Sequence, residues 1–224
     1  MMQQRSVMFR KRQISGKKGI SGEEYQEMPF IRYIEKNQER TTMSEYITTY
    51  TGNHINPTNP NPALIRIEDI AHALSLLCRG NGHVKTFWSV GQHCICCAKE
   101  AMARGATARV VLACLLHDAS ECYMSDVPTP FKKKLPEYEV QEEQLLGMIF
   151  EKFLGSDLTK EEWEQVKEID HAMLWYDLKE LLGEVTDEKR PSVHIVLDYK
   201  VQPFREVEAE YLRIFTAYCG KLRG

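Results

Sequence analysis

Residues 107–121 read TARVVLACLLHDASE. Thr107 is typical of a helix N-cap, and Val110–Leu116 is apolar on every side, so this helix must be surrounded by other elements. The run ends at the adjacent pair His117 and Asp118. A buried carboxylate without a partner is very costly, so Asp118 should face a cation or a dense hydrogen-bond network. The alternative is a helix end whose histidine and aspartate meet water. The stretch predicts a central helix with candidate metal ligands at its end.

Other segments show the same helical spacing of apolar residues. Thr159 and Glu162 form a capping box that opens one of these helices. The Gly, Asn and Pro content of Thr48–Pro62 predicts a loop, and the β-branched residues near 192–202 predict a short hairpin or an extended arm. The fold class is therefore all-α, a bundle of five to six main helices. The further helices are expected at about 67–78, 89–102, 137–154, from Thr159 through position 170, and 204–219.

Charge divides the chain into two parts. Residues 1–42 carry nine basic and five acidic side chains, and the rest carries 20 basic and 27 acidic, a net charge of −7. We therefore expect a partly disordered basic N-terminal arm at 1–42 and one domain at 43–224. The acidic domain argues against a broad nucleic-acid surface.

The compartment is expected to be the cytoplasm. The sequence contains no run of roughly 20 apolar residues and no apolar secretory signal at its N-terminus. The seven cysteines are an odd number in a chain too large to need disulfide staples, so they are expected to be reduced and mostly buried. A metal site at Cys94, Cys96 and Cys97 is the less favoured reading, since this cluster lacks paired C-x-x-C motifs.

Two more polar residues fall on apolar helix faces. Asp170 lies four residues after Val166 and three before Met173, so its carboxylate is expected to point inward. Asp177 lies seven residues further on and is a candidate outer partner. His93 follows the start of a helix in SVGQH. Taken singly, His93 is also explained as a hydrogen-bonded histidine of the core. Asp170 is also explained as a residue at the edge of the apolar helix face, where its carboxylate meets water.

Taken together, the two imidazoles and two carboxylates make a metal-ligating set. The set is His93, His117, Asp118 and Asp170, and it suits one borderline divalent ion such as Mn, Co, Fe, Ni or Zn. Further ions arriving with a substrate are compatible with it.

The order of these residues resembles the HD-domain phosphohydrolase superfamily, whose signature is a His, an adjacent His-Asp pair and a distant Asp. Several consecutive blocks resemble one branch, the bacterial 5'-deoxynucleotidases, and they cover most of residues 44–182 and the last helix. The blocks read HALSLLCRGNGH at 72–83, SVGQH at 89–93, LLHDASECYMSDVPTPFK at 115–132 and EIDHAML at 168–174.

The resemblance implies an enzyme that removes phosphate from a small nucleotide, in particular a (deoxy)nucleoside 5'-monophosphate. It assigns Arg79 to the phosphate and implies that Glu121 and Asp126 act beside the metal, as catalytic residues that orient a water or carry its proton. On a continuous helix Glu121 would share the face of Asp118. By position alone, His83 and Lys132 are candidate substrate-binding residues.

Other interpretations stay open. On the same fold, a dNTP triphosphohydrolase would need more cations or metals around the phosphate tail. A different class of function is also open: a non-catalytic binding protein that a metal stabilises and whose basic arm binds RNA. Aromatic residues near the motifs could stack on a base, although side chains at such positions are more often core. No membrane partner is expected, and because relatives with this fold are often dimers, a homodimer is a candidate assembly. The aromatic residues are Phe87, Trp88, Tyr123 and Phe131.

Overall fold

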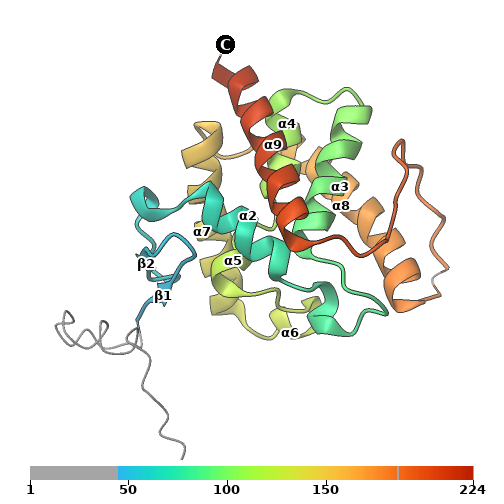
Figure 1. Ribbon diagram of the computed structural model, residues 1–224, viewed down its shortest axis with the longest axis horizontal. Coiled ribbons are helices and arrows are strands. Elements are labelled where there is room, and N and C mark those ends of the chain that lie inside the picture. Colours follow the sequence, from blue (N-terminus) through green and yellow to red (C-terminus); the bar gives the residue numbers. More distant parts are fainter. Residues whose placement is uncertain (1–44, 186, 224) are drawn as a thin grey trace, which may run out of the picture. The chain divides into compact units, whose positions relative to one another are not determined.

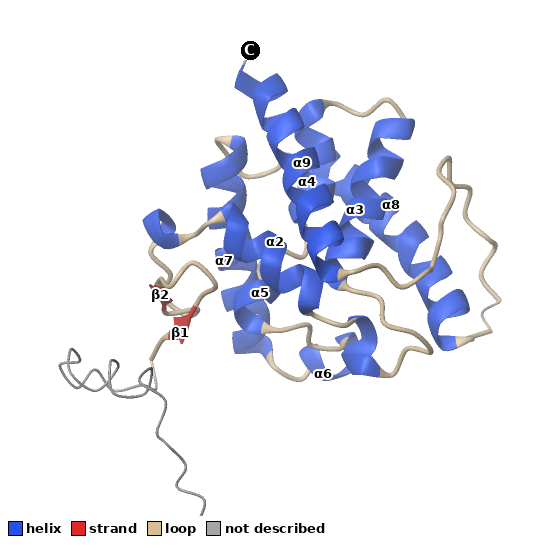
Figure 2. Ribbon diagram, in the orientation of Figure 1, coloured by secondary structure: helices blue, strands red, loops and turns tan. Residues whose placement is uncertain are grey.

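The structure is a computed structural model, which describes residues 45–185 and 187–223. The described part is a bundle of helices with one small hairpin (Figure 2). This confirms the expected all-α class. The prediction for residues 1–42 lies outside the described residues, and the division of the chain into an arm and a domain stays a prediction.

Most elements of the bundle follow one another with short connections, while a long segment, residues 183–203, precedes the last helix (Figure 1). A 3-10 helix, η1 (Pro62–Leu64), precedes the bundle, and a second, η2 (Arg79–Gly82), follows its first helix. The α-helices are α2 (Ile67–Leu76), α3 (Val90–Ala103), α4 (Ala108–Leu116), α5 (Glu121–Met124), α6 (Thr129–Lys132), α7 (Pro136–Leu154), α8 (Lys160–Asp177) and α9 (Phe204–Arg223). A π-helical turn, η3 (Leu178–Leu182), directly continues α8.

Local capping sets where the helices begin. The Thr107 hydroxyl accepts a hydrogen bond from the Val110 amide at the start of α4, as expected. The predicted capping box of Thr159 and Glu162 opens α8. A second capping box, in which Ser89 is the N-cap, opens α3 and so places His93 in its first turn. These caps satisfy amides that a helix start leaves without partners.

Helix α4 is the centre of the bundle. Every residue of Val110–Leu116 is buried, and α4 packs against α3, α7, α8 and α9. In Figure 1, α9 crosses in front of α4 and α3. The prediction of a surrounded central helix is therefore confirmed.

The chain does not continue as one helix from α4 to Glu121, and that expectation was wrong. Residues 117–120 form a turn between α4 and α5. The carbonyl of Cys114 accepts a hydrogen bond from His117 Nδ1, and the carbonyl of Leu115 accepts one from the Tyr211 hydroxyl, at 2.8 and 2.6 Å. Because these are the carbonyls that would accept the amides of residues 118 and 119, the helical ladder ends here.

Of the two forms expected near 192–202, a hairpin or an extended arm, the hairpin is not found, since the described residues of this segment form no strand. Its amides at His194 and Ile195 instead donate to the buried carboxylate of Glu100 on α3, at 2.8 and 3.2 Å. A side chain thus satisfies backbone groups that a partner strand would have satisfied. The hairpin of the structure joins β1 (Ile47–Thr48) and β2 (His54–Ile55), inside the segment predicted as a loop.

Within the described residues, no helix is long and apolar enough to cross a bilayer. Three of the cysteines, Cys94, Cys97 and Cys114, are buried, and the other four are half-buried.

Candidate metal centre and adjoining cavity

Of the four residues expected to hold a metal, the donor atoms of His93, His117 and Asp170 lie within 4.8 Å of one another, and Asp118 adjoins them through His117. His93 lies on α3, His117 and Asp118 follow α4 directly, and Asp170 lies on α8. The Nε2 atom of His93 is 3.0 Å from Asp170 Oδ1. The Nε2 atom of His117 is 3.3 Å from Asp118 Oδ1 and 3.5 Å from Asp170 Oδ1. Three elements that are distant in sequence therefore direct two imidazoles and two carboxylates at a common centre.

The far side of each imidazole is held by a hydrogen bond. His93 Nδ1 donates to Asp177 Oδ2 at 2.8 Å, and His117 Nδ1 donates to the Cys114 carbonyl at 2.8 Å. Histidines that bind metals usually make such a bond, which sets the tautomer and the ring orientation. Both Nε2 atoms are thereby directed at the centre. The Tyr199 hydroxyl donates to Asp177 Oδ1 at 2.9 Å and secures that carboxylate.

The chemistry of these donors fits a divalent ion. His117 Nε2 is buried and makes no hydrogen bond among the described residues, although two carboxylates lie within 3.5 Å. A buried polar atom without a partner is costly, and a metal ion at the centre would satisfy it. Imidazole and carboxylate ligands suit a borderline ion of the first transition series or zinc. The metal-binding role stays a prediction, and the geometry supports it.

The metal-free centre is strongly coupled electrostatically. Burial and the nearby Arg79 lower the pKa of His93, but its hydrogen bonds to Asp170 and Asp177 outweigh them and raise it. Burial likewise lowers the pKa of His117, and Asp118 raises it well above the usual value. Burial raises the pKa of Asp170, yet the two imidazoles hold it well below its usual range. The imidazoles and carboxylates of the centre thus shift one another's pKa values in opposite directions.

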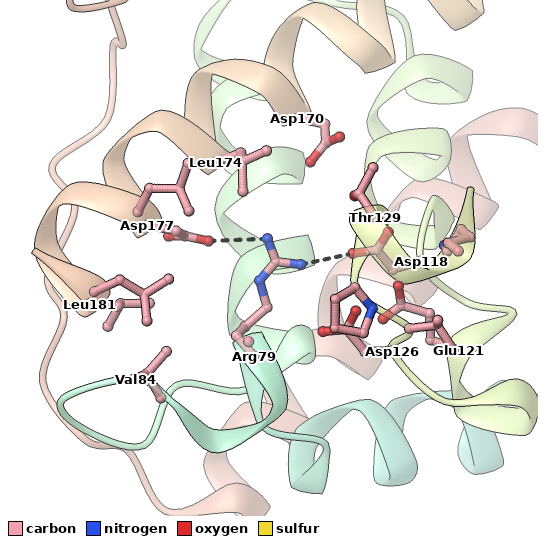
Figure 3. A pocket seen from close by; sticks show the side chains of 16 residues that line it. Arg79, Val84, Asp118, Glu121, Asp126, Thr129, Asp170, Leu174, Asp177 and Leu181 are labelled. Carbon is pink, nitrogen blue, oxygen red and sulfur yellow. Dashed lines mark hydrogen bonds and ion pairs between the residues drawn. The ribbon is translucent and has the colours of Figure 1, made fainter. Parts of the chain in front are cut away.

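Arg79 lies beside the centre between two acids. It begins η2, and its guanidinium is 3.5 Å from Asp118 Oδ2 through Nη1 and 3.5 Å from Asp177 Oδ2 through Nη2 (Figure 3). Its backbone amide donates to the Trp88 carbonyl, which ties η2 to the residue before the α3 cap. Burial lowers the pKa of Arg79, and the two carboxylates raise it by more, so the side chain is a buried cation.

Glu121 and Asp126 lie on the same side of Arg79 as Asp118, opposite Asp177 (Figure 3). Glu121 is buried, and within the described part of the chain its Oε2 atom makes no hydrogen bond. Burial raises its pKa well above the usual value, and Asp118 and Asp126 raise it further. Burial also raises the pKa of Asp126. Just before Asp126, Ser125 has a φ of 76°, a strained conformation of the kind that collects at functional sites.

These residues line a cavity of about 360 Å³. Lys132 reaches it from α6 but is held by Glu142, with 2.8 Å between Nζ and Oε1. In Figure 3, Val84, Leu174 and Leu181 lie on the side of Asp177 and form an aliphatic wall. The spacing of Leu174, four residues after Asp170 and three before Asp177, could have placed it on the face of the ligands.

Some residues singled out from the sequence do not reach the cavity. His83 is exposed and lies outside its lining, so its substrate-binding role stays a prediction. Among the described residues, no aromatic side chain lines the cavity. Trp88 packs on Tyr199, with 4.8 Å between ring centroids, Tyr123 is buried elsewhere, and Phe131 is exposed.

Residues 82–188 match the HD domain family. The matched segment contains His93, the pair His117 and Asp118, and Asp170, in the order of the HD signature. Arg79 and α9 lie outside it. The match confirms the resemblance to the HD domain family over these residues, and the relation to 5'-deoxynucleotidases stays a proposal.

Two curated relatives match part of the chain. The uncharacterized protein YfdR of Escherichia coli is 38% identical over 108 residues, which are 48% of this chain and 58% of the relative. An uncharacterized protein of Rhodobacter capsulatus is 39% identical over 87 residues, 37% of this chain and 44% of the relative. The chain thus spans about half the length of the curated relatives it matches.

Proposed function

We propose that this protein is a metal-dependent phosphohydrolase that removes phosphate from a (deoxy)nucleoside 5'-monophosphate. The observation that carries the proposal is one cavity lined by two of the four donors, Asp118 and Asp170, together with a buried arginine and two carboxyls with raised pKa values. The HD domain match and the cluster of His and Asp donors support the metal-dependent class. The nucleotide substrate rests on the resemblance of the sequence blocks.

His93, His117, Asp118 and Asp170 would hold the ion. When bound, a divalent ion supplies Lewis-acid polarisation of the phosphoryl group and makes the attacking water more acidic. Asp177 and the Cys114 carbonyl keep the two imidazoles in the tautomer that leaves Nε2 free.

Arg79 would bind the phosphoryl oxygens. Its planar guanidinium offers paired donors in a geometry that a lysine ammonium lacks. In the substrate-free structure its contacts with Asp118 and Asp177, at 3.5 Å, are long for charge-assisted hydrogen bonds. The guanidinium is therefore held in place by weak contacts that an incoming phosphate can replace.

Glu121 and Asp126 would handle the proton. The burial of Glu121 raises its pKa well above the usual value, and a raised pKa is typical of carboxyls that transfer protons in active sites. Its unpartnered Oε2 atom lies at the cavity wall, where it can orient the attacking water. Asp126 lines the same wall and is a second candidate for this role.

The charges of the cavity favour a monophosphate over a triphosphate. Its cationic lining residues are Arg79 and Lys132, and both already contact acids. Five carboxylates line the same space, so a highly charged triphosphate tail would meet repulsion from groups that one metal ion only partly offsets. At about 360 Å³ the cavity is near the lower end of ligand pockets, roughly 300–1,000 Å³. The carboxylates are Asp118, Glu121, Asp126, Asp170 and Asp177.

A panel of nucleoside mono-, di- and triphosphates, assayed with Mn²⁺, Co²⁺ or Zn²⁺, tests this proposal. We expect inorganic phosphate from monophosphates, and little turnover of triphosphates. Asp118→Asn should abolish turnover, whereas Asp198→Asn should not, because Asp198 is exposed and contacts Lys200. Release of triphosphate or pyrophosphate would point to the alternative activity, and inertness on the whole panel would refute the proposal.

A further inference from the structure

A layer of buried thiols lies against the imidazoles of the metal centre. Cys94 and Cys97 belong to α3, and Cys114 belongs to α4. Their residues are at most 1% exposed. Cys97 lies one helical turn after His93, so the two side chains share one face of α3.

The thiol of Cys97 points at the same position as the metal-ligating nitrogens. Its Sγ atom is 3.5 Å from His93 Nε2. The donor atoms of His93, Cys97, His117 and Asp170 all lie within 4.8 Å of one another. With metal–ligand bonds of about 2.0–2.3 Å, two ligand atoms of a tetrahedral site lie roughly 3.3–3.8 Å apart, and the 3.5 Å between Cys97 Sγ and His93 Nε2 falls in this range. Independently, the buried Nε2 atom of His117 enters this cluster without a hydrogen-bond partner.

Cys94 is the weaker candidate for a sulfur ligand. Its Sγ atom is 4.0 Å from Asp118 Oδ2 and forms a smaller group with His117 and Asp118. Cys94 thus adjoins His117 and Asp118, whereas Cys97 shares its group with three of the expected ligands, His93, His117 and Asp170. Cys94 serves as a close control for the role of Cys97.

We propose that Cys97 is a sulfur ligand of the metal ion, so that the centre prefers Zn²⁺, Fe²⁺ or Co²⁺ over Mn²⁺ or Mg²⁺. The inference rests on the proposed metal centre and not on its activity. As the bond from Sγ to the metal forms, the S–H bond breaks and its proton leaves to solvent, with no change of oxidation state. Thiolate ligands favour softer ions, while a centre of imidazole and carboxylate alone accepts harder ones.

Titration of the metal-free protein with Co²⁺ tests the inference without any substitution. We expect one ion per chain and, in step with it, a sulfur-to-cobalt charge-transfer absorption in the near ultraviolet. Binding of Co²⁺ without this absorption would overturn the sulfur ligand and leave the metal centre in place. Failure to bind any divalent ion would overturn the centre and, with it, the sulfur ligand.

Substitutions then assign the sulfur. Cys97→Ser should abolish the charge-transfer absorption, and Cys94→Ser should retain it. Cys122→Ser is a second control, because Cys122 is on α5 and lines a different cavity. Persistence of the absorption in Cys97→Ser, or its loss in Cys94→Ser alone, would refute the assignment.

Metal preference provides a second readout. In Cys97→Ser and Cys97→Ala, the affinity for Zn²⁺ relative to Mn²⁺ should fall by at least about tenfold, the lower figure for losing even an outer partner of a metal site. Competitive binding with a chelator of known affinity measures this ratio. An unchanged ratio in both variants would refute the proposed preference.

Discussion

Asp177 links the metal centre to the residues around it, and Asp177→Asn tests that link most directly. Its carboxylate accepts hydrogen bonds from His93 Nδ1 and from the Tyr199 hydroxyl, and it lies 3.5 Å from an Arg79 nitrogen. An asparagine has almost the same shape but offers an N–H₂ group on one side. If that group faces Nδ1, the imidazole must carry its proton on Nε2, where the metal should bind.

The expected cost follows from this role. Loss of an outer partner of a metal ligand typically lowers metal affinity by about 10- to 100-fold, which corresponds to about 1.4–2.8 kcal/mol. Asp177 is buried and contacts both the expected metal ligand His93 and the buried guanidinium of Arg79, so we expect a loss in the upper part of this range. Thermal unfolding of the metal-free variant should show whether the fold is retained.

Calorimetric titration of the metal-free protein with Co²⁺ or Zn²⁺ measures the effect. Asp198→Asn is the matched control, because it makes the same change at an exposed carboxylate whose contact is Lys200. Equal metal affinity in wild-type protein and Asp177→Asn would refute the tautomer argument. A similar loss in Asp198→Asn would show that the effect is not specific to the hydrogen bond with His93.

Three further predictions concern the same region. Glu121→Gln should keep metal affinity but lower kcat by about 100-fold or more, whereas His117→Ala should lose both the metal and turnover. Elemental analysis measures the bound metal, and equal metal loss in the two variants would contradict the separation of roles. Tyr199→Phe should weaken metal binding by up to about 10-fold, because the hydrogen bond it loses orients the Asp177 carboxylate and not a metal ligand itself. Tyr176→Phe releases a different contact of the segment 187–203 and should leave metal binding unchanged. Folding raises the pKa of His93 and His117. The protonated imidazoles therefore stabilise the folded protein fully below about pH 6.5, and this stabilisation is lost as the pH rises through their folded-state pKa values. The Tm of the metal-free protein should fall toward alkaline pH, and a constant Tm would argue against this coupling.

Local patterns were sufficient for much of the helical architecture. The unbroken apolar run of α4 requires burial on all sides, and the capping boxes of α3 and α8 satisfy amides within three residues of the helix start. These interactions are short-range, so a sequence displays them directly. The HD order of His93, His117, Asp118 and Asp170 is visible for the same reason, because it is a matter of residue type and position.

Long-range contacts decided the rest. The carbonyls of Cys114 and Leu115 end α4 early because a neighbouring imidazole and the distant Tyr211 hydroxyl occupy them. The segment 192–202 is extended without pairing because the buried carboxylate of Glu100 receives its amides. Tyr211 lies 96 residues from Leu115 and Glu100 lies 94 residues from His194, so no local sequence pattern could reveal these two contacts.

The same division holds for the metal centre. The sequence by itself determined which histidines and aspartates could hold an ion, since only their chemical types and helix faces were needed. The tertiary structure decided that their atoms converge, that Tyr199 secures the carboxylate behind His93, and that Cys97 points a sulfur at the same centre. Such distances depend on how α3, α4 and α8 pack, which is a property of the whole core and not of any one segment.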